Sequence, residues 1–128
     1  MIQQITEGVK ISVQSNFVST YFDGESLKFK FSYFIEIENN NPYSLQLISR
    51  KWIIMDALNQ SEIVEGIGVI GQQPVLKPFE SYRYNSGCVM KGPVGSMKGV
   101  YRMVRLSDQH TFEVIIPNFR HCAEFTQN

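Results

Sequence analysis

Apolar and polar residues alternate along much of the chain, which is the pattern of β-strands that bury one face. The clearest run covers residues 29–38, in which five apolar residues line one face and most residues of the other face are polar: Phe29, Phe31, Tyr33, Ile35 and Ile37 form the apolar face. Shorter runs of the same kind cover residues 9–14, 97–104 and 112–116. The run 50–55 is apolar on both faces from Trp52 onward, which predicts a central strand covered on two sides.

Turn-forming residues separate these runs. Clusters of Asp, Asn, Gly and Pro occur at 23–25, 39–42, 56–59, 77–80 and 91–95. No window has apolar residues at helical spacing over a helical length. About seven to nine short strands therefore predict an all-β protein, an immunoglobulin or fibronectin type III-like antiparallel β-sandwich. We expect a single domain over residues 1–128, with its core at about 8–119 and a polar, loosely held tail from Arg120.

Charge and length narrow the function classes. The chain has 128 residues, and 12 basic residues balance 12 acidic ones. This neutrality gives no long-range field for nucleic acid or anionic lipid, so we expect neither as a partner. The longest apolar runs are far too short to cross a membrane. The first residues lack the basic and apolar regions of a signal peptide, and two cysteines are too few for a disulfide framework, so we expect a cytoplasmic protein.

The glycine-rich segment 66–71 is the main candidate site. Gly66, Gly68 and Gly71 match the Gly-x-Gly-x-x-Gly spacing of a phosphate-binding loop. A dinucleotide fingerprint would have to open a helix, and Pro74 follows too soon for that. Two interpretations stay open: glycines that only permit a tight connection, or a nest of backbone N–H groups that binds an anion. Arg50 is the cation proposed for that nest, with Lys77 and Lys98 as further candidates.

Metal binding and catalysis have little support. The soft ligands are Cys88, His110, His121 and Cys122, and only His121 and Cys122 are close in sequence. Adjacent residues on a strand point to opposite faces, so these two rarely share one ion. A Cys–His nucleophile pair could be formed only by Cys88 with one of the two histidines, and no paired carboxylates stand out. We expect no metal site, no cofactor and no enzyme activity.

Five sequence blocks resemble one known family. They are Ser49-Arg50-Lys51-Trp52, Gly66-Ile67-Gly68-Val69-Ile70-Gly71-Gln72-Gln73-Pro74, Tyr84-Asn85-Ser86-Gly87, Pro93-Val94-Gly95-Ser96-Met97-Lys98-Gly99-Val100-Tyr101 and Ile116-Pro117-Asn118-Phe119. In this order, from Gly8 to Phe119, the chain is similar to the bacterial ApaG proteins. Phe79 departs from the family pattern, which has glycine after the proline. The tail that contains Cys122 also lies outside the shared pattern.

The resemblance implies a fibronectin type III-like fold and a non-catalytic role. The same domain occurs in some eukaryotic F-box proteins, where it looks like a protein-interaction module, and the bacterial family is linked with cobalt resistance and magnesium efflux. It implies no catalytic residues. We therefore expect a binding module with a protein partner, whose link to metal ions is indirect. The alternative is a protein that binds pyrophosphate or a nucleotide at Gly66–Gly71.

Two further expectations concern surfaces. A sandwich gathers its loops at its two ends, so the glycine segment and the 93–95 connection are expected to form one functional surface. Exposed strand edges also make a homodimer possible.

Overall fold

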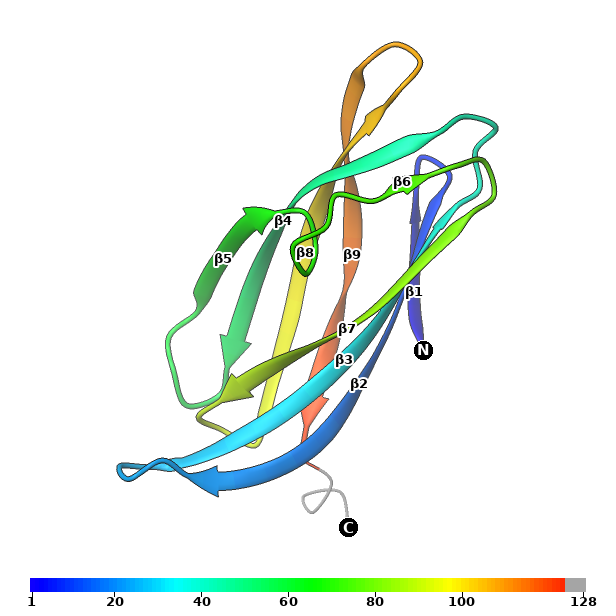
Figure 1. The fold of residues 1–128 in the computed structure, drawn as a ribbon. Helices are drawn as coiled ribbons and strands as arrows, with labels where there is room; N and C mark the ends of the chain where they lie inside the picture. Colours follow the sequence, from blue (N-terminus) through cyan, green and yellow to red (C-terminus); the bar gives the residue numbers. More distant parts are fainter. Residues whose placement is uncertain (124–128) are drawn as a thin grey trace.

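The computed structural model describes residues 1–123, which form nine strands and no helix. The strands are β1 (Ile2–Thr6), β2 (Val9–Phe22), β3 (Leu27–Asn39), β4 (Leu45–Asp56), β5 (Glu62–Ile67), β6 (Val75–Leu76), β7 (Ser81–Met90), β8 (Val94–Arg105) and β9 (His110–Cys122). Figure 1 shows them in two packed layers. Over these residues, there is no helix that could span a membrane.

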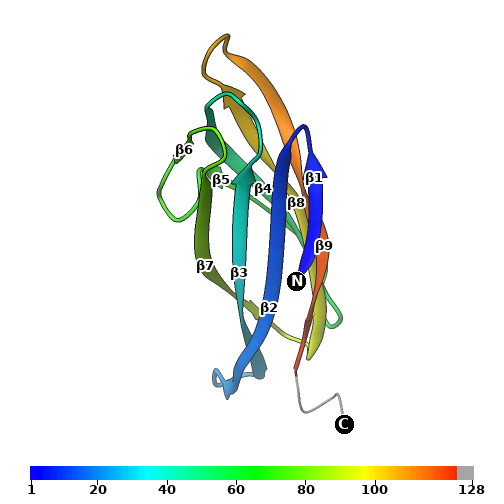
Figure 2. The ribbon, with the colours of Figure 1, turned by 90° about the vertical axis from the view of Figure 1, so that its right-hand side faces the viewer.

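The strands form two antiparallel sheets that face each other, which confirms the predicted immunoglobulin or fibronectin type III-like sandwich. One sheet has the order β1-β2-β3-β7 and the other β5-β4-β8-β9, with β6 paired to β4. Figure 2 shows the first sheet in front of the second. The β2–β3 hairpin continues past the last residue pair with β7, Phe29–Met90, so its tip projects from the sandwich in Figure 1.

The core lies between the two sheets and contains the residues that the alternation predicts. The five inward-facing apolar residues of the 29–37 run are each at most 6% exposed. Tyr33 of one sheet packs against three rings of the other sheet. The ring centroids of Trp52 and Phe119 lie 5.6 and 5.7 Å from that of Tyr33, and His121 lies next to them. Aromatic contacts of this kind join the sheets beyond simple burial of apolar area.

β4 differs from the prediction on its outer face. It is a central strand, as predicted, lying between β5 and β8. Its inward residues are Trp52, which is buried, and Ile54, which packs against the core, but the outward residues Ile53 and Met55 are only half-buried. No second layer of described residues covers the outer side of this sheet, so the apolar residues there are exposed to solvent instead of covered.

The ends of the chain carry more structure than the sequence pattern predicts. Residues 2–6 form β1, whose apolar residues Ile2 and Ile5 do not alternate and so give no strand signal. β9 does not end before Pro117 but continues to Cys122, and His121 and Ala123 are fully buried. The expectation of a loosely held tail is therefore wrong for residues 120–123; the rest of the tail, 124–128, lies outside the described residues.

Aspartate side chains stabilise three of the expected turns, and a fourth contains a non-glycine residue with positive φ. The Asp23 carboxylate accepts hydrogen bonds from the backbone N–H groups of Glu25 and Ser26, as Asp does in turns. Asp56 accepts from three backbone N–H groups, those of Leu58, Lys91 and Gly92, and so joins the β4–β5 and β7–β8 turns. In the turn before β7, Phe79 has a φ of 63°, a conformation that favours glycine.

Candidate functional site

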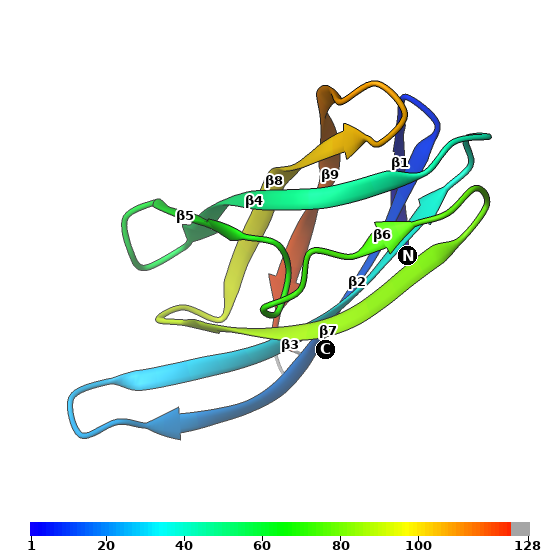
Figure 3. The same ribbon diagram turned by 45° about the horizontal axis from the view of Figure 1, so that its top comes forward.

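The glycine segment crosses the open edge of the sandwich between β4 and β7 (Figure 3). The Gly68 N–H donates to the Ile48 carbonyl oxygen at 2.8 Å. Val69 and Gln72 exchange two backbone hydrogen bonds of 2.8 and 2.9 Å. The Val69 side chain is completely buried in the core, while Ile70 is 56% exposed. The segment is thus a tight loop anchored by one buried side chain.

Gly68 is required by a close backbone approach within this loop, and Gly66 leaves room for the Arg50 side chain. Gly68 has a φ of +61°, and a Cβ there would lie 1.9 Å from the Gln72 carbonyl oxygen. A Cβ on Gly66 would lie 2.7 Å from the Arg50 guanidinium. Gly71 has a φ of +71° but no neighbouring atom within 4 Å. The loop geometry alone therefore accounts for these glycines.

Arg50 lies beside the loop with part of its guanidinium unused. Its Nη1 donates to the carbonyl oxygens of Ile67 at 3.1 Å and Gly68 at 2.8 Å. Its Nε and Nη2 make no hydrogen bond with any residue that the structure describes, and no described carboxylate is within ion-pair distance. The loop therefore orients the guanidinium and leaves two of its nitrogens available for an anion.

Strand pairing explains why other polar groups gather around Arg50. In one sheet, Arg50 stands opposite Gly66 and Tyr101. In the facing sheet, Tyr33 stands opposite Ser86. A pocket of about 120 Å³ between the sheets, which we call the Arg50 pocket, is lined by Tyr33, Arg50, Trp52, Val69, Ile70, Tyr84 and Ser86.

The pocket has one charge and several neutral hydroxyl groups. The hydroxyl groups of Tyr84 and Tyr101 are hydrogen-bonded to each other. Burial raises the pKa of Tyr33, Tyr84 and Tyr101, so these phenols stay protonated at neutral pH. No acidic residue lines the pocket. A guanidinium with hydroxyl donors can hydrogen-bond a carboxylate or a phosphate group, and these residues supply no paired acid and base for catalysis.

The predicted anion nest is limited by the loop's own bonding. Of its backbone N–H groups, those of Gly68, Val69 and Gln72 are used within the protein, whereas those of Ile70 and Gly71 have no partner among residues 1–123. Binding of an anion there stays a prediction. The structure brings Gly66, Gly68 and Arg50 together.

The pocket also contains residues that sequence reasoning missed. Lys77 and Lys98 do not line the pocket, whereas Tyr33, Tyr84 and Ser86 do. Alternation marked Tyr33 as core, but nothing in the sequence pairs it with Ser86.

The expected link between the glycine segment and the 93–95 connection is wrong. Gly66 pairs with Arg50 in the middle of β4, whereas Gly95 pairs with Asp56 at its end. Six residues of extended strand separate these two positions, which is about 20 Å. The two loops therefore lie at different places on the molecule, as Figure 1 shows.

None of the cysteines and histidines lines the Arg50 pocket. Burial, followed by the charges of Glu62 and Asp56, raises the pKa of the Cys88 thiol to about 11, which disfavours the thiolate. His121 is buried with Ser15 and Met97 on its two ring nitrogens. Within the described part of the chain, no three His, Cys, Asp or Glu residues are grouped to hold a metal ion.

Comparison with known proteins identifies the family. A family model described as the ApaG domain matches residues 19–105. The chain belongs to the ApaG family. Protein ApaG from Anaeromyxobacter dehalogenans is 45% identical over 119 residues, which is 93% of each chain. Protein ApaG from Beijerinckia indica is 40% identical over 127 residues, covering 99% of this chain and 97% of that one.

Solved structures of similar sequence have the same fold. A crystal structure of a Bordetella pertussis protein named ApaA has a TM-score of 0.80 and 35% identity, covering 90% of this chain and 93% of that chain. A second X-ray structure, a structural-genomics target, has a TM-score of 0.86 and 35% identity, covering 91% and 87%. The ApaG sandwich is thus shared by this chain and by experimentally determined structures.

Proposed function

We propose that this ApaG-family chain is a non-catalytic binding module for a protein partner in the bacterial cytoplasm, and that the Arg50 pocket takes a carboxylate of that partner. The observation that carries the proposal is the state of Arg50. Two hydrogen bonds to loop carbonyls fix the guanidinium, and its Nε and Nη2 face no described acceptor. A pre-oriented guanidinium loses less entropy when it binds a carboxylate than a mobile one does.

The size and surroundings of the pocket support a group of this kind. A volume of about 120 Å³ suits a carboxylate-bearing side chain or chain end better than a whole cofactor. The hydroxyl groups of Ser86, Tyr33 and Tyr84 supply polar contacts, and Trp52 and Val69 supply apolar walls. A link to cobalt or magnesium would then pass through the partner, because no described residues form a metal cluster.

A second candidate is a small phosphate ligand, such as pyrophosphate or a nucleotide, in the same pocket. The observation that favours it is the pair of N–H groups on Ile70 and Gly71, which no described residue accepts. Both residues have positive φ, of 46° and 71°, and form the centre of the tight turn that the Val69–Gln72 pair closes. Ile70 also lines the pocket.

An amide-resolved NMR titration tests both candidates. The ligands are N-acetylglutamate, pyrophosphate, and ATP with and without magnesium, each added to the full chain. A carboxylate site predicts saturable shifts at Arg50, Ser86 and Ile70 with N-acetylglutamate, with a dissociation constant of about 1 mM for one such contact. Larger shifts with pyrophosphate, centred on Ile70 and Gly71, would favour the phosphate ligand.

Two variants make the titration specific. Arg50→Gln should abolish the shifts while its dispersed spectrum shows that it is folded. Arg83→Gln, an exposed arginine on the other sheet, should leave them unchanged. Shifts that persist in Arg50→Gln, or the absence of any saturable shift in the folded wild type, would contradict both candidates.

A further inference from the structure

The outer face of the β5-β4-β8-β9 sheet carries aliphatic residues where a sandwich usually has polar ones. Strand register places Ile63 opposite Ile53, and Val100 opposite Ile115, on the outward side of neighbouring strands. Ile67 lies on the same side of β5, opposite Ser49. Exposed fractions are 61% for Ile63, 74% for Ile67 and 43% for Ile115. We call these five residues the aliphatic face.

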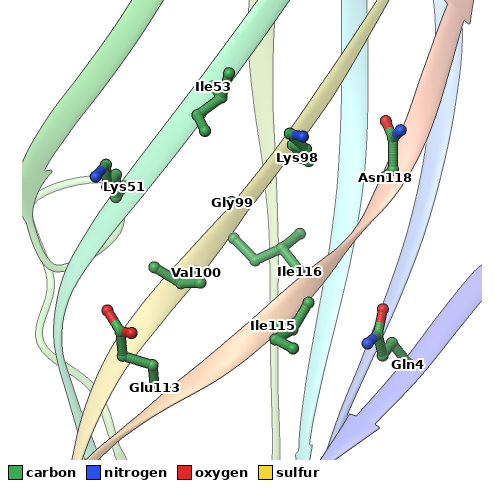
Figure 4. Close-up of a pocket in the computed structure, with 10 residues that line it drawn as sticks. All are labelled: Gln4, Lys51, Ile53, Lys98, Gly99, Val100, Glu113, Ile115, Ile116 and Asn118. Carbon is green, nitrogen blue, oxygen red and sulfur yellow. The ribbon is translucent and has the colours of Figure 1, made fainter.

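A shallow groove of about 460 Å³ crosses this face (Figure 4). Its floor includes Gly99, Val100 and Ile115, and its rim includes Lys51, Lys98 and Glu113. A Cβ on Gly99 would lie 2.1 Å from the Lys51 carbonyl oxygen, so only glycine permits this approach of β8 to β4. In Figure 4 the side chains of Val100 and Ile115 lie near the centre of the groove, with Lys51 and Lys98 on its borders.

Charged residues form ion pairs on the outer face of the other sheet, but the cations around the aliphatic face do not. On the outer face of the β1-β2-β3-β7 sheet, Lys10 contacts Glu38 at 3.3 Å and Arg83 contacts Glu36 at 2.6 Å. On the aliphatic side, several exposed cations form no ion pair with any residue in the described range, among them Lys51, Lys98 and Arg102.

Register shows which of these charges has an acidic neighbour. Lys51 stands opposite Glu65 and Arg102 opposite Glu113, so each has one acidic residue across the strand pair. Lys98 stands opposite Ile53 and has none. The face therefore has a surplus of positive charge next to aliphatic surface.

We infer that the aliphatic face is a docking surface for an acidic segment of a partner protein, one that presents aliphatic side chains between Asp or Glu residues. Carboxylates would pair with Lys98, Lys51 and Arg102, and the aliphatic side chains would cover Val100, Ile115 and Ile53. A second copy of the chain fits less well, because the surplus positive charge of one copy would face the surplus positive charge of the other. Nucleic acid fits less well, because its phosphates would meet aliphatic floor and two glutamates.

This surface is distinct from the Arg50 pocket and does not rest on the function proposed for it. The probe is a short peptide of alternating leucine and glutamate with blocked termini, titrated into the full chain and followed by amide NMR. We expect saturable shifts at Ile53, Lys98, Val100 and Ile115 that weaken with added salt. The same peptide with lysine in place of glutamate should not bind.

Matched variants separate this inference from the proposed function. Lys98→Glu should lower the affinity about tenfold, since it replaces attraction with repulsion at the rim. Lys30→Glu, the same change on the other sheet, and Arg50→Gln should leave it unchanged. Four results would each overturn the inference. They are equal binding of the lysine peptide, shifts confined to the Arg50 pocket, shifts caused by self-association alone, and no shifts at millimolar peptide.

Discussion

Acidification is expected to weaken the fold through His121, whose imidazole is fully buried. Its Nε2 lies 3.0 Å from the Met97 Sδ and its Nδ1 2.6 Å from the Ser15 Oγ. A thioether has no proton to donate, so Nε2 donates to sulfur and Nδ1 accepts from the hydroxyl. The ring also packs against Phe31 and Phe119 at centroid distances of 4.8 and 5.1 Å. No acidic group is within ion-pair distance of the ring among the described residues.

The size of the effect follows from the His121 pKa. Burial lowers this pKa from 6.5 to about 4. Between these values the unfolded chain binds a proton that the folded chain does not, so the free energy of unfolding falls as the pH falls. The stabilisation is fully present above pH 6.5 and is lost by about pH 4. A shift of this size corresponds to about 3 kcal/mol in all, and to about 2 kcal/mol between pH 7.5 and 5.0.

Urea unfolding at these two pH values, followed by the fluorescence of the buried Trp52, measures the loss. In His121→Gln, which cannot titrate, the pH-dependent loss should be smaller than in the wild type by about 2 kcal/mol, whatever its stability at pH 7.5. The exposed His110 provides the control, since His110→Gln should keep the wild-type pH dependence. His121→Phe serves as a second variant if the glutamine does not fold. An equal pH dependence in wild type and both His121 variants would refute the reasoning.

Four further substitutions probe the turns and strand contacts, each by the urea midpoint. Asp56→Ala removes three backbone hydrogen bonds and should cost about 2 kcal/mol; no loss would show that water replaces them fully. Gly99→Ala should cost about 3 kcal/mol because its Cβ would meet the Lys51 carbonyl, whereas Gly87→Ala, with 3.5 Å of space, should change stability by less than about 1 kcal/mol. Similar effects at both glycines would argue against the close approach. Phe79→Gly should stabilise by about 0.5 to 1 kcal/mol, since it relieves a φ of 63° on an exposed phenylalanine; a loss of stability would mean that its ring contributes.

Most of the fold could be predicted from sequence because alternation reports burial directly. Between Phe29 and Ile37 the five inward-facing residues recur with a period of two and are all buried, and Phe34 is the one apolar residue on the opposite face. Alternation did not predict the full length of β9, because this strand continues through a proline. Pro117 lies in β9 where the register with β8 shifts between Met97 and Gly99. A bulge in an edge strand accepts a residue without an N–H, so the strand continues past the proline.

The candidate site was only partly predictable, because it depends on which strands face each other. The Gly-x-Gly spacing located the loop, but the sequence could name Arg50 only beside two other candidate cations, Lys77 and Lys98. The hydroxyl groups of Tyr33 and Ser86 come from the other sheet, and no local pattern reports that contact. The sequence also does not predict the hydrogen bonds within the loop. They use three of the N–H groups on which an anion nest would depend.

The most direct test of the central claim is the Nε–H resonance of Arg50, observed while N-acetylglutamate or pyrophosphate is added to the full chain. This group has no acceptor among the residues described, so it should exchange readily with water before ligand is added. If the pocket binds an anion, the resonance should shift saturably and become protected, in parallel with the amide of Ile70. An Arg50 Nε–H that neither shifts nor gains protection at saturating concentrations of both ligands would contradict the account.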